Sequence, residues 1–390
     1  MEKLIVKCDS FIMPSGIWSG YIACADGKIV SVTKDKPGMD GKFIDATGFY
    51  VSPGFIDIHT HGAGGADFMD GDAESFITAV NTHMRHGTTT ILPTTVAADI
   101  ERIHLFIENF HEAKKTLGDV IFGAHIEGPY CNSAQAGALD PTALKDPCEA
   151  EYKRVIEMGN GVVKRWSIAP ELPGALEMGD YLNANGCIPS IAHSAAEYQE
   201  VLEARNHHYT LITHLYSCTS TIIRKSGYRF PGVMESAYIL DDLDAEIIAD
   251  GHHLPIELLK LVYKSKGPEH IAMCTDSMRA AGAGLSESIL GGKENGIKII
   301  IEDGVAKLAD RSSFAGSVAT ADQLVRVMHK KAGVDIVNTV AMITKTPARI
   351  LGIQNKKGVL AVNMDSDMVV FNDDIEIQTV ISGGVVKYQR

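Results

Sequence analysis

The sequence predicts an α/β fold of the (β/α)8 barrel type, and three observations support this prediction. Eight short apolar runs have the character of strands, and they begin near residues 55, 89, 120, 164, 188, 210, 246 and 271. Segments with helical periodicity lie between them, for example residues 74–86, 100–117 and 195–205. Several runs end on a polar side chain, which is where the catalytic groups of such a barrel gather. We expect this barrel to span residues 54–357.

Further short strands are expected at both ends of the chain, outside the barrel. Gly and Asp turns separate these runs, as is typical of small antiparallel sheets. In order along the chain they are residues 4–6, 18–23, 28–32, 43–45, 368–371, 379–382 and 385–388. Residues 1–53 and 358–390 are therefore expected to form a second, smaller domain.

The first barrel strand ends on two histidines, His59 and His61. Side chains alternate along a strand, so residues i and i+2 share a face and both imidazoles can bind one divalent cation. Later strands end on further groups of the same kind, which are Glu127, His193, His214 and Asp276. Because these strand ends meet at one rim of a barrel, the sequence predicts a metal centre there.

Each of these residues also has a structural interpretation when it is taken alone. A His-x-His pair occurs by chance in a chain with 15 histidines, and Asp276 is placed where it would cap a helix. Glu127 could form a salt bridge at the rim, and His193 and His214 could be core histidines bonded to the backbone. Their convergence on one rim favours the metal centre over these separate explanations.

The pattern of His59, His61, His193, His214 and Asp276 resembles the amidohydrolase superfamily. Five further motifs are Ile126-Glu127-Gly-Pro-Tyr130, Thr213-His-Leu-Tyr216, Ile248-Ala-Asp-Gly-His-His253, Thr275-Asp276 and Phe314-Ala-Gly-Ser317. Within the superfamily, these motifs together resemble the N-acetylglucosamine-6-phosphate deacetylase family over nearly the whole chain. The resemblance implies a barrel joined to a small β-sandwich that both ends of the chain build, and a homodimer.

The resemblance also implies roles for individual residues. Asp276 is the expected catalytic acid and base. The expected metal ligands are Glu127, His193, His214, His59 and His61. The expected substrate-binding residues are Ala138, Ser217, Cys218, Arg229, His253, Phe314, Ala315 and Gly316, with Arg229 contacting the phosphate of the neighbouring subunit's substrate. The bound metal is expected to be zinc, as one or two ions, with iron, cobalt and manganese as alternatives.

Three positions depart from the family pattern. Leu139 stands near the place where members with a single metal carry a carbonyl-polarising histidine, which favours a second metal at His59 and His61. The segment Ser217-Cys218-Thr219 replaces the family's Asn-Ala-Met, so the identity of the sugar stays open. Phe230 replaces an acidic residue after Arg229.

The expected activity is metal-dependent hydrolysis of the acetamide of N-acetylglucosamine 6-phosphate, which releases acetate and glucosamine 6-phosphate. One alternative is deacetylation of N-acetylgalactosamine 6-phosphate. Hydrolysis of a cyclic amide or a dipeptide on the same barrel is another, but the carboxylated lysine that bridges metals in some such enzymes has no counterpart, since Lys164 lies at the start of its strand. A barrel that serves only as an interaction scaffold is disfavoured because no expected metal ligand is missing.

Composition limits the partners and the compartment. The formal net charge of −13 argues against nucleic acid and anionic membranes, so a phosphorylated substrate needs a local basic group. Seven cysteines are scattered without a Cys-x-x-Cys pair, and no apolar run has the length of a signal or membrane segment. We expect a cytoplasmic enzyme of amino-sugar catabolism.

Overall fold

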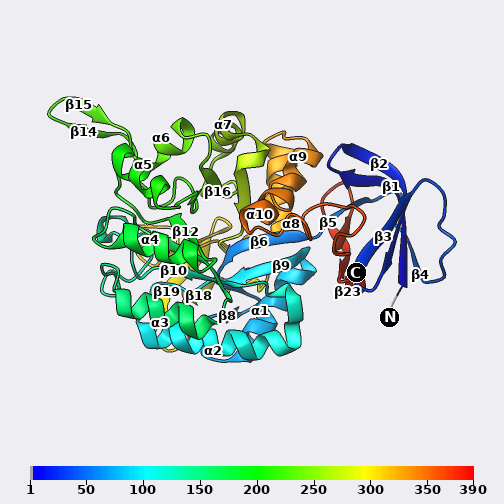
Figure 1. The fold of residues 1–390 in the computed structure, drawn as a ribbon, viewed down its shortest axis with the longest axis horizontal. Helices are drawn as coiled ribbons and strands as arrows, with labels where there is room; N and C mark the ends of the chain where they lie inside the picture. The colour runs from blue at the N-terminus through cyan, green and yellow to red at the C-terminus, as the bar shows by residue number, and fades with distance from the viewer. Residues whose placement is uncertain (1–2) are drawn as a thin grey trace.

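The computed structural model describes residues 3–390, and Figure 1 shows the two ends of the chain together in one sheet. This end sheet has the strand order β23-β22-β21-β5-β1-β2-β3, with β4 paired to β1. Its central join is the antiparallel pair of β5 and β21, in which Val51 faces Val370. The strands are β1 (Lys3–Met13), β2 (Gly16–Ala25), β3 (Lys28–Thr33), β4 (Lys42–Asp45), β5 (Tyr50–Pro53), β21 (Met368–Phe371), β22 (Ile377–Ser382) and β23 (Val385–Gln389).

A curled sheet of parallel strands fills the rest of the molecule. The strands are β6 (Phe55–Thr60), β9 (Thr88–Pro93), β10 (Ala124–Glu127), β11 (Val163–Ile168), β12 (Ile188–Ile191), β13 (Leu211–Ile212), β16 (Asp244–Ile248) and β17 (Ile271–Cys274). Parallel pairing runs from β10 through β17 in that order, and β6 pairs with β9. Isolated parallel bridges connect the two sets, from Thr94 to His125 and from Thr60 to Ser277.

All eight strands expected from the sequence are present, although two are shorter than predicted. The third begins at Ala124 rather than near residue 120, because Gly118–Val120 forms a 3-10 turn that closes the preceding helix. The sixth is reduced to Leu211 and Ile212. The side chains of the parallel strands are almost all buried, for example in β6, β9 and β11, as expected for parallel strands that helices cover.

The helices lie outside these strands (Figure 1). They are α1 (Ala73–Arg85), α2 (Ile100–Leu117), α3 (Glu149–Gly159), α4 (Ala175–Ala184), α5 (Tyr198–Asn206), α6 (Val233–Ile239), α7 (Ile256–Lys266), α8 (Ala321–Arg326), α9 (Ile336–Ala341) and α10 (Lys345–Ile350). None of them combines the length and apolar character that crossing a membrane requires.

Local sequence explains where three helices begin. Asp72 and Asp99 cap α1 and α2 by accepting backbone N–H groups of the first turn. Helix α5 begins at Tyr198 and not at residue 195 as predicted. The N–H of Ala195 donates to Glu171 instead, at 2.6 Å, and Glu200 accepts from the N–H of Glu197 to form a capping box.

Short β-elements that the sequence did not predict follow two of the parallel strands. The pair β7 (Gly62–Ala63) and β8 (Ala66–Asp67) follows β6, and a three-stranded sheet follows β17. That sheet consists of β18 (Glu287–Leu290), β19 (Ile297–Glu302) and β20 (Val305–Leu308). The hairpin of β14 (Ile223–Lys225) and β15 (Tyr228–Phe230) projects from the body of the molecule (Figure 1).

Candidate metal centre

A cavity of about 230 Å³ opens at the carboxyl ends of the parallel strands. Five of the six residues predicted to bind metal or transfer protons line it: His61, Glu127, His193, His214 and Asp276. The sixth, His59, lies beneath them and is fully buried. The strand ends therefore bring the predicted polar residues together in one place.

Glu127 lies at the centre of this group. Its Oε1 is 3.4 Å from Nε2 of His193 and 3.1 Å from Nε2 of His214. Its Oε2 is 3.3 Å from Nε2 of His61. Oε1 also lies 3.5 Å from Nε2 of His59, so the carboxylate contacts the His59/His61 pair as well as His193 and His214, an arrangement that suits a carboxylate shared by two cations.

Asp276 completes the second set. Its Oδ1 lies 3.1 Å from Nε2 of His61 and 3.4 Å from Nε2 of His59. Two clusters with metal-ligand geometry result, one of Glu127, His193 and His214 and the other of His59, His61 and Asp276. Nitrogen and carboxylate donors in groups of three match the ligand sets of catalytic zinc and related ions.

The outer nitrogens of three of these histidines are held by hydrogen-bond acceptors. Nδ1 of His193 contacts the carbonyl oxygen of Gln135 at 2.8 Å, and Nδ1 of His214 contacts that of Ser217 at 3.1 Å. Nδ1 of His59 contacts Glu246 at 2.8 Å. An acceptor at Nδ1 favours the tautomer whose Nε2 carries a lone pair. Nε2 of His59 is buried and has no hydrogen-bond partner among the described residues. Such an atom is available to bind a cation.

The backbone turns sharply where three of the side chains enter the cavity. His193, His214 and Asp276 have φ angles of 44°, 29° and 45°, in the left-handed region that residues other than glycine rarely adopt. Each lies two residues beyond the last residue of its strand, β12, β13 or β17. Strained backbone of this kind persists where the surrounding structure holds it, often at functional sites.

The electrostatics of the centre favour positive charge. Burial alone would lower the pKa of His59, but the negative charges of Asp276, Glu246 and Glu127 outweigh it and raise that pKa to about 9. Burial alone would raise the pKa of Asp276, whereas the positive charge of His59 and contact with His61 lower it below its ordinary value. A divalent cation would supply the same compensation to these buried carboxylates.

Most of the predicted substrate-binding residues lie around the same cavity. Ala138, Ser217, Cys218, His253, Phe314 and Gly316 line it. The ring of His253 packs 4.9 Å from that of Phe314, and its Nδ1 contacts Asp250 at 2.7 Å. Ala315 is buried behind the lining. Arg229 lies on the exposed hairpin strand β15 and does not line the cavity.

Sequence reasoning missed three buried polar residues beneath the centre, Glu246, Arg165 and His125. Glu246 and Arg165 form an ion pair, and the ring of His125 lies 4.6 Å from that of His59. Arg165 and Glu246 occur inside runs predicted to be strands without a ligand, and His125 lies two residues before Glu127 in the run that ends on it. For Arg165 and Glu246, the signal of a buried ion pair was a charged residue within an otherwise apolar strand, because full burial of a charge requires a partner.

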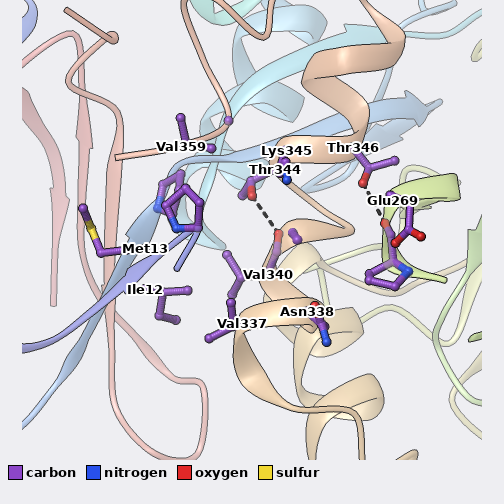
Figure 2. A pocket seen from close by; sticks show the side chains of 15 residues that line it. Ile12, Met13, Glu269, Val337, Asn338, Val340, Thr344, Lys345, Thr346 and Val359 are labelled. Atoms are coloured by element: carbon purple, nitrogen blue, oxygen red, sulfur yellow. Dashed lines mark hydrogen bonds between the residues drawn. The ribbon is translucent and has the colours of Figure 1, made fainter. Parts of the chain in front are cut away.

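A second cavity of about 160 Å³ lies where the end sheet meets α9 and α10 (Figure 2). Apolar side chains such as Ile12, Met13 and Val337 contribute much of its lining. The hydroxyl groups of Thr344 and Thr346 donate to the carbonyl oxygens of Val340 and Pro268. None of the predicted site residues lines this cavity.

Comparison with known proteins gives consistent matches. A family model described as the amidohydrolase family matches residues 50–387. The N-acetylglucosamine-6-phosphate deacetylase of Bacillus subtilis (strain 168) is 30% identical, over 99% of this chain and 98% of the relative. The N-acetylgalactosamine-6-phosphate deacetylase of Shewanella sp. (strain ANA-3) is 30% identical, over 86% and 82% of the two chains. A mutant of the N-acetyl-D-glucosamine-6-phosphate deacetylase from Mycobacterium smegmatis, solved in complex with N-acetyl-D-glucosamine 6-phosphate, has a TM-score of 0.91 and 27% identity, with 100% of both chains covered.

Proposed function

The chain belongs to the amidohydrolase family, and we propose that it hydrolyses the acetamide of N-acetylglucosamine 6-phosphate to glucosamine 6-phosphate and acetate. The observation that carries this proposal is the position of Glu127, whose two oxygens face His61 on one side and His193 and His214 on the other. Together with the relatives reported above, this geometry fits metal-dependent amide hydrolysis in amino-sugar catabolism.

The proposed architecture is a closed (β/α)8 barrel of residues 54–357 with a small domain of residues 1–53 and 358–390, in which the single end sheet folds over its own core as a β-sandwich. Closure is supported by the bridge from Thr94 to His125, beside β9 and β10, and by the bridge from Thr60 at the end of β6 to Ser277, three residues beyond the end of β17. The separate domain is supported by its own core, in which Leu4, Val6 and Phe11 pack with Met368 and Ile381.

The proposed ligands are Glu127, His193 and His214 for one cation, and His59 and His61 for a second that Glu127 also contacts. Zinc is the proposed ion, because imidazole and carboxylate donors suit it. A divalent cation acts as a Lewis acid, which lowers the pKa of water and polarises a carbonyl oxygen. Leu139 in the cavity wall has no side-chain donor for the substrate carbonyl, which supports the presence of the second cation.

Asp276 is the proposed proton-transfer residue. It lines the cavity, and its lowered pKa keeps the carboxylate ionised at neutral pH, as a general base must be. The carboxylate takes a proton from the attacking water and then gives that proton to the departing amine nitrogen. The amide C–N bond breaks, and acetate and the free amino sugar leave.

The proposed sugar site is formed by Ala138, Ser217, Cys218, His253, Phe314, Ala315 and Gly316. Arg229 is proposed to bind the phosphate of a substrate held by a second copy of the chain, because it lies on a projecting hairpin and not at its own cavity. Exposed Tyr228 and Ile222 near it, 74% and 52% accessible, support a homodimer contact there. We place the enzyme in the cytoplasm.

N-acetylgalactosamine 6-phosphate is the second candidate substrate. It is favoured by the Ser217-Cys218-Thr219 segment, which places a short hydroxyl in the cavity wall where the family carries asparagine. The two sugars differ in the orientation of one hydroxyl group, so a single changed side chain is enough to alter the preference.

The deciding experiment measures acetate release by the metal-loaded protein. Three substrates are compared: the 6-phosphates of N-acetylglucosamine and N-acetylgalactosamine, and unphosphorylated N-acetylglucosamine. We expect the glucosamine derivative to be cleaved with the highest kcat/KM and the unphosphorylated sugar poorly. A preference for the galactosamine derivative would establish the second candidate, and no release from any of them would overturn both.

A further inference from the structure

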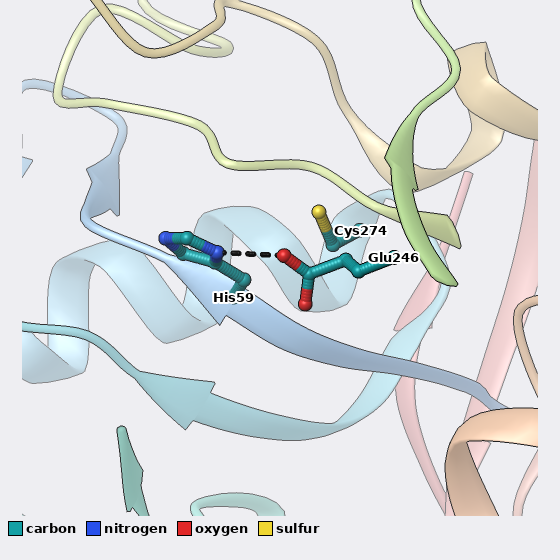
Figure 3. Close-up of side chains that lie close together, drawn as sticks. All are labelled: His59, Glu246 and Cys274. Carbon is teal, nitrogen blue, oxygen red and sulfur yellow. Dashed lines mark hydrogen bonds and ion pairs between the residues drawn. The ribbon is translucent and has the colours of Figure 1, made fainter. Parts of the chain in front are cut away.

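A buried hydrogen-bond network lies directly beneath the proposed metal centre. Figure 3 shows His59 pointing its Nδ1 at the carboxylate of Glu246, with the thiol of Cys274 beside them. The contact between Nδ1 of His59 and Oε1 of Glu246 is 2.8 Å long. The side chains of His59 and Glu246 are both fully buried, so neither group has water as an alternative partner.

The carboxylate of Glu246 accepts three hydrogen bonds from protein groups. Besides His59, its Oε1 accepts the backbone N–H of His214 at 3.2 Å. Its Oε2 forms an ion pair with Arg165, whose side chain is also fully buried. The guanidinium group of Arg165 supplies the positive charge that this buried carboxylate requires. Glu246 therefore accepts from His59, Arg165 and the N–H of His214 as an ionised carboxylate.

Arg165 extends the network to the strands that carry the two histidines. Its Nη1 donates to the carbonyl oxygen of Ile58 at 3.2 Å, and its Nη2 donates to Oγ1 of Thr213 at 2.8 Å. Ile58 directly precedes His59, and Thr213 directly precedes His214. Arg165 and Glu246 together hold the backbone and one side chain at the ends of β6 and β13.

The same side chains have the spacing of a metal site, because His59, Glu246 and Cys274 each offer a ligand atom within 4.8 Å of the others. A cation between them would have to displace the hydrogen bond of His59 and would lie beside the guanidinium group of Arg165. The positive charge that Glu246 needs is already supplied by Arg165. A positioning role fits the cluster better than a third cation.

We propose that Glu246, supported by Arg165, is a positioning residue that fixes His59 with its proton on Nδ1 and its Nε2 lone pair facing Glu127 and Asp276. This inference rests on the proposed function, since it assigns a purpose to the orientation of a proposed ligand. Nε2 of His59 lies 3.5 Å from Glu127 and 3.4 Å from Asp276, so the fixed ring aims at the space between the two carboxylates. An acceptor at the outer nitrogen of a ligating histidine is what sets its tautomer.

The test is a zinc titration of the metal-free protein and of Glu246→Gln, without substrate. Glutamine has the same shape but only one acceptor oxygen and an NH2 group. If the NH2 group faces Arg165, two hydrogen-bond donors oppose each other. If it faces His59, it favours the tautomer with a proton on Nε2, and Nε2 then has no lone pair for zinc. We expect the affinity for the zinc ion that His59 binds to fall about 10- to 100-fold.

Two variants make the zinc titration specific. His59→Ala identifies which zinc equivalent depends on His59, and in that background most of the effect of Glu246→Gln should disappear. Cys274→Ala removes a side chain of the same cluster that takes no part in the network, and it should bind zinc as the wild type does. Loss of a zinc equivalent in Cys274→Ala would overturn the proposal in favour of a cation bound at Cys274.

Unchanged zinc affinity in Glu246→Gln, or an equal loss with and without His59, would also overturn the positioning role. If Glu246→Gln does not fold, proton NMR of the zinc-loaded wild type replaces it. A downfield Nδ1–H signal that is missing in His59→Ala is expected, and its absence from the wild type contradicts the proposal. All these readouts are independent of acetate release, so a failure of the proposed substrate leaves them interpretable.

Discussion

The carboxylate of Asp276 lies 3.1 Å from Nε2 of His61 at the floor of the cavity. The side chain of the proposed proton-transfer residue thus contacts the side chain of a proposed metal ligand. If a cation held at this site bound the attacking water, a base in this place would be close to that water and to the leaving nitrogen of a bound amide.

Replacing Asp276 with asparagine should abolish turnover while zinc content stays intact. The amide cannot accept and return a proton, and the expected fall in kcat is about 100- to 10,000-fold. Steady-state rates and metal analysis of the same preparation provide the measurement. Retained turnover would remove Asp276 from its proposed role, and loss of zinc together with activity would make it a ligand instead.

Removal of metal by a chelator should stop hydrolysis, and added Zn²⁺ should restore it. We expect two zinc equivalents in the wild type, because the histidines form two sets around Glu127. His61→Ala should lose one equivalent and His193→Ala the other, as measured by elemental analysis after equilibrium dialysis. Two equivalents retained in His61→Ala would show that the second set does not bind metal.

The clustering of the proposed metal-site residues was predictable from the sequence because these residues follow a simple positional rule. His193, His214 and Asp276 each come two residues after a strand ends, and the ends of parallel strands meet at one rim. That rule is independent of loop conformation, so the strand pattern was enough to predict that these side chains lie together.

Other parts of the site depend on contacts that no local pattern encodes. Leu290 reaches the cavity from β18, which pairs antiparallel with β19 and not with a strand of the parallel sheet. Glu246 and Arg165 meet across strands 81 residues apart in sequence. Their pairing follows from the curvature of the parallel sheet, which the sequence indicates only through charges placed within apolar runs.

Arg229→Ala should raise KM for the phosphorylated substrate about 10- to 100-fold, with a much smaller effect on unphosphorylated N-acetylglucosamine. Charge-assisted hydrogen bonds to a phosphate account for an effect of this size. Arg154→Ala, which changes an exposed arginine on α3, is the matched control and should leave both KM values unchanged. Equal effects of Arg229→Ala on both substrates would contradict phosphate binding.

Ser217→Asn should raise kcat/KM for N-acetylglucosamine 6-phosphate relative to the galactosamine derivative. The backbone of Ser217 holds His214, since its carbonyl oxygen contacts Nδ1 at 3.1 Å, but its side chain lines the cavity. The substitution therefore changes the sugar wall and leaves the metal ligand in place. One additional hydrogen bond corresponds to a change of up to about tenfold in the ratio. Ser313→Asn, at another serine of the same cavity, is the control for added bulk, and an equal shift in both variants would show that size and not the hydrogen bond determines the preference.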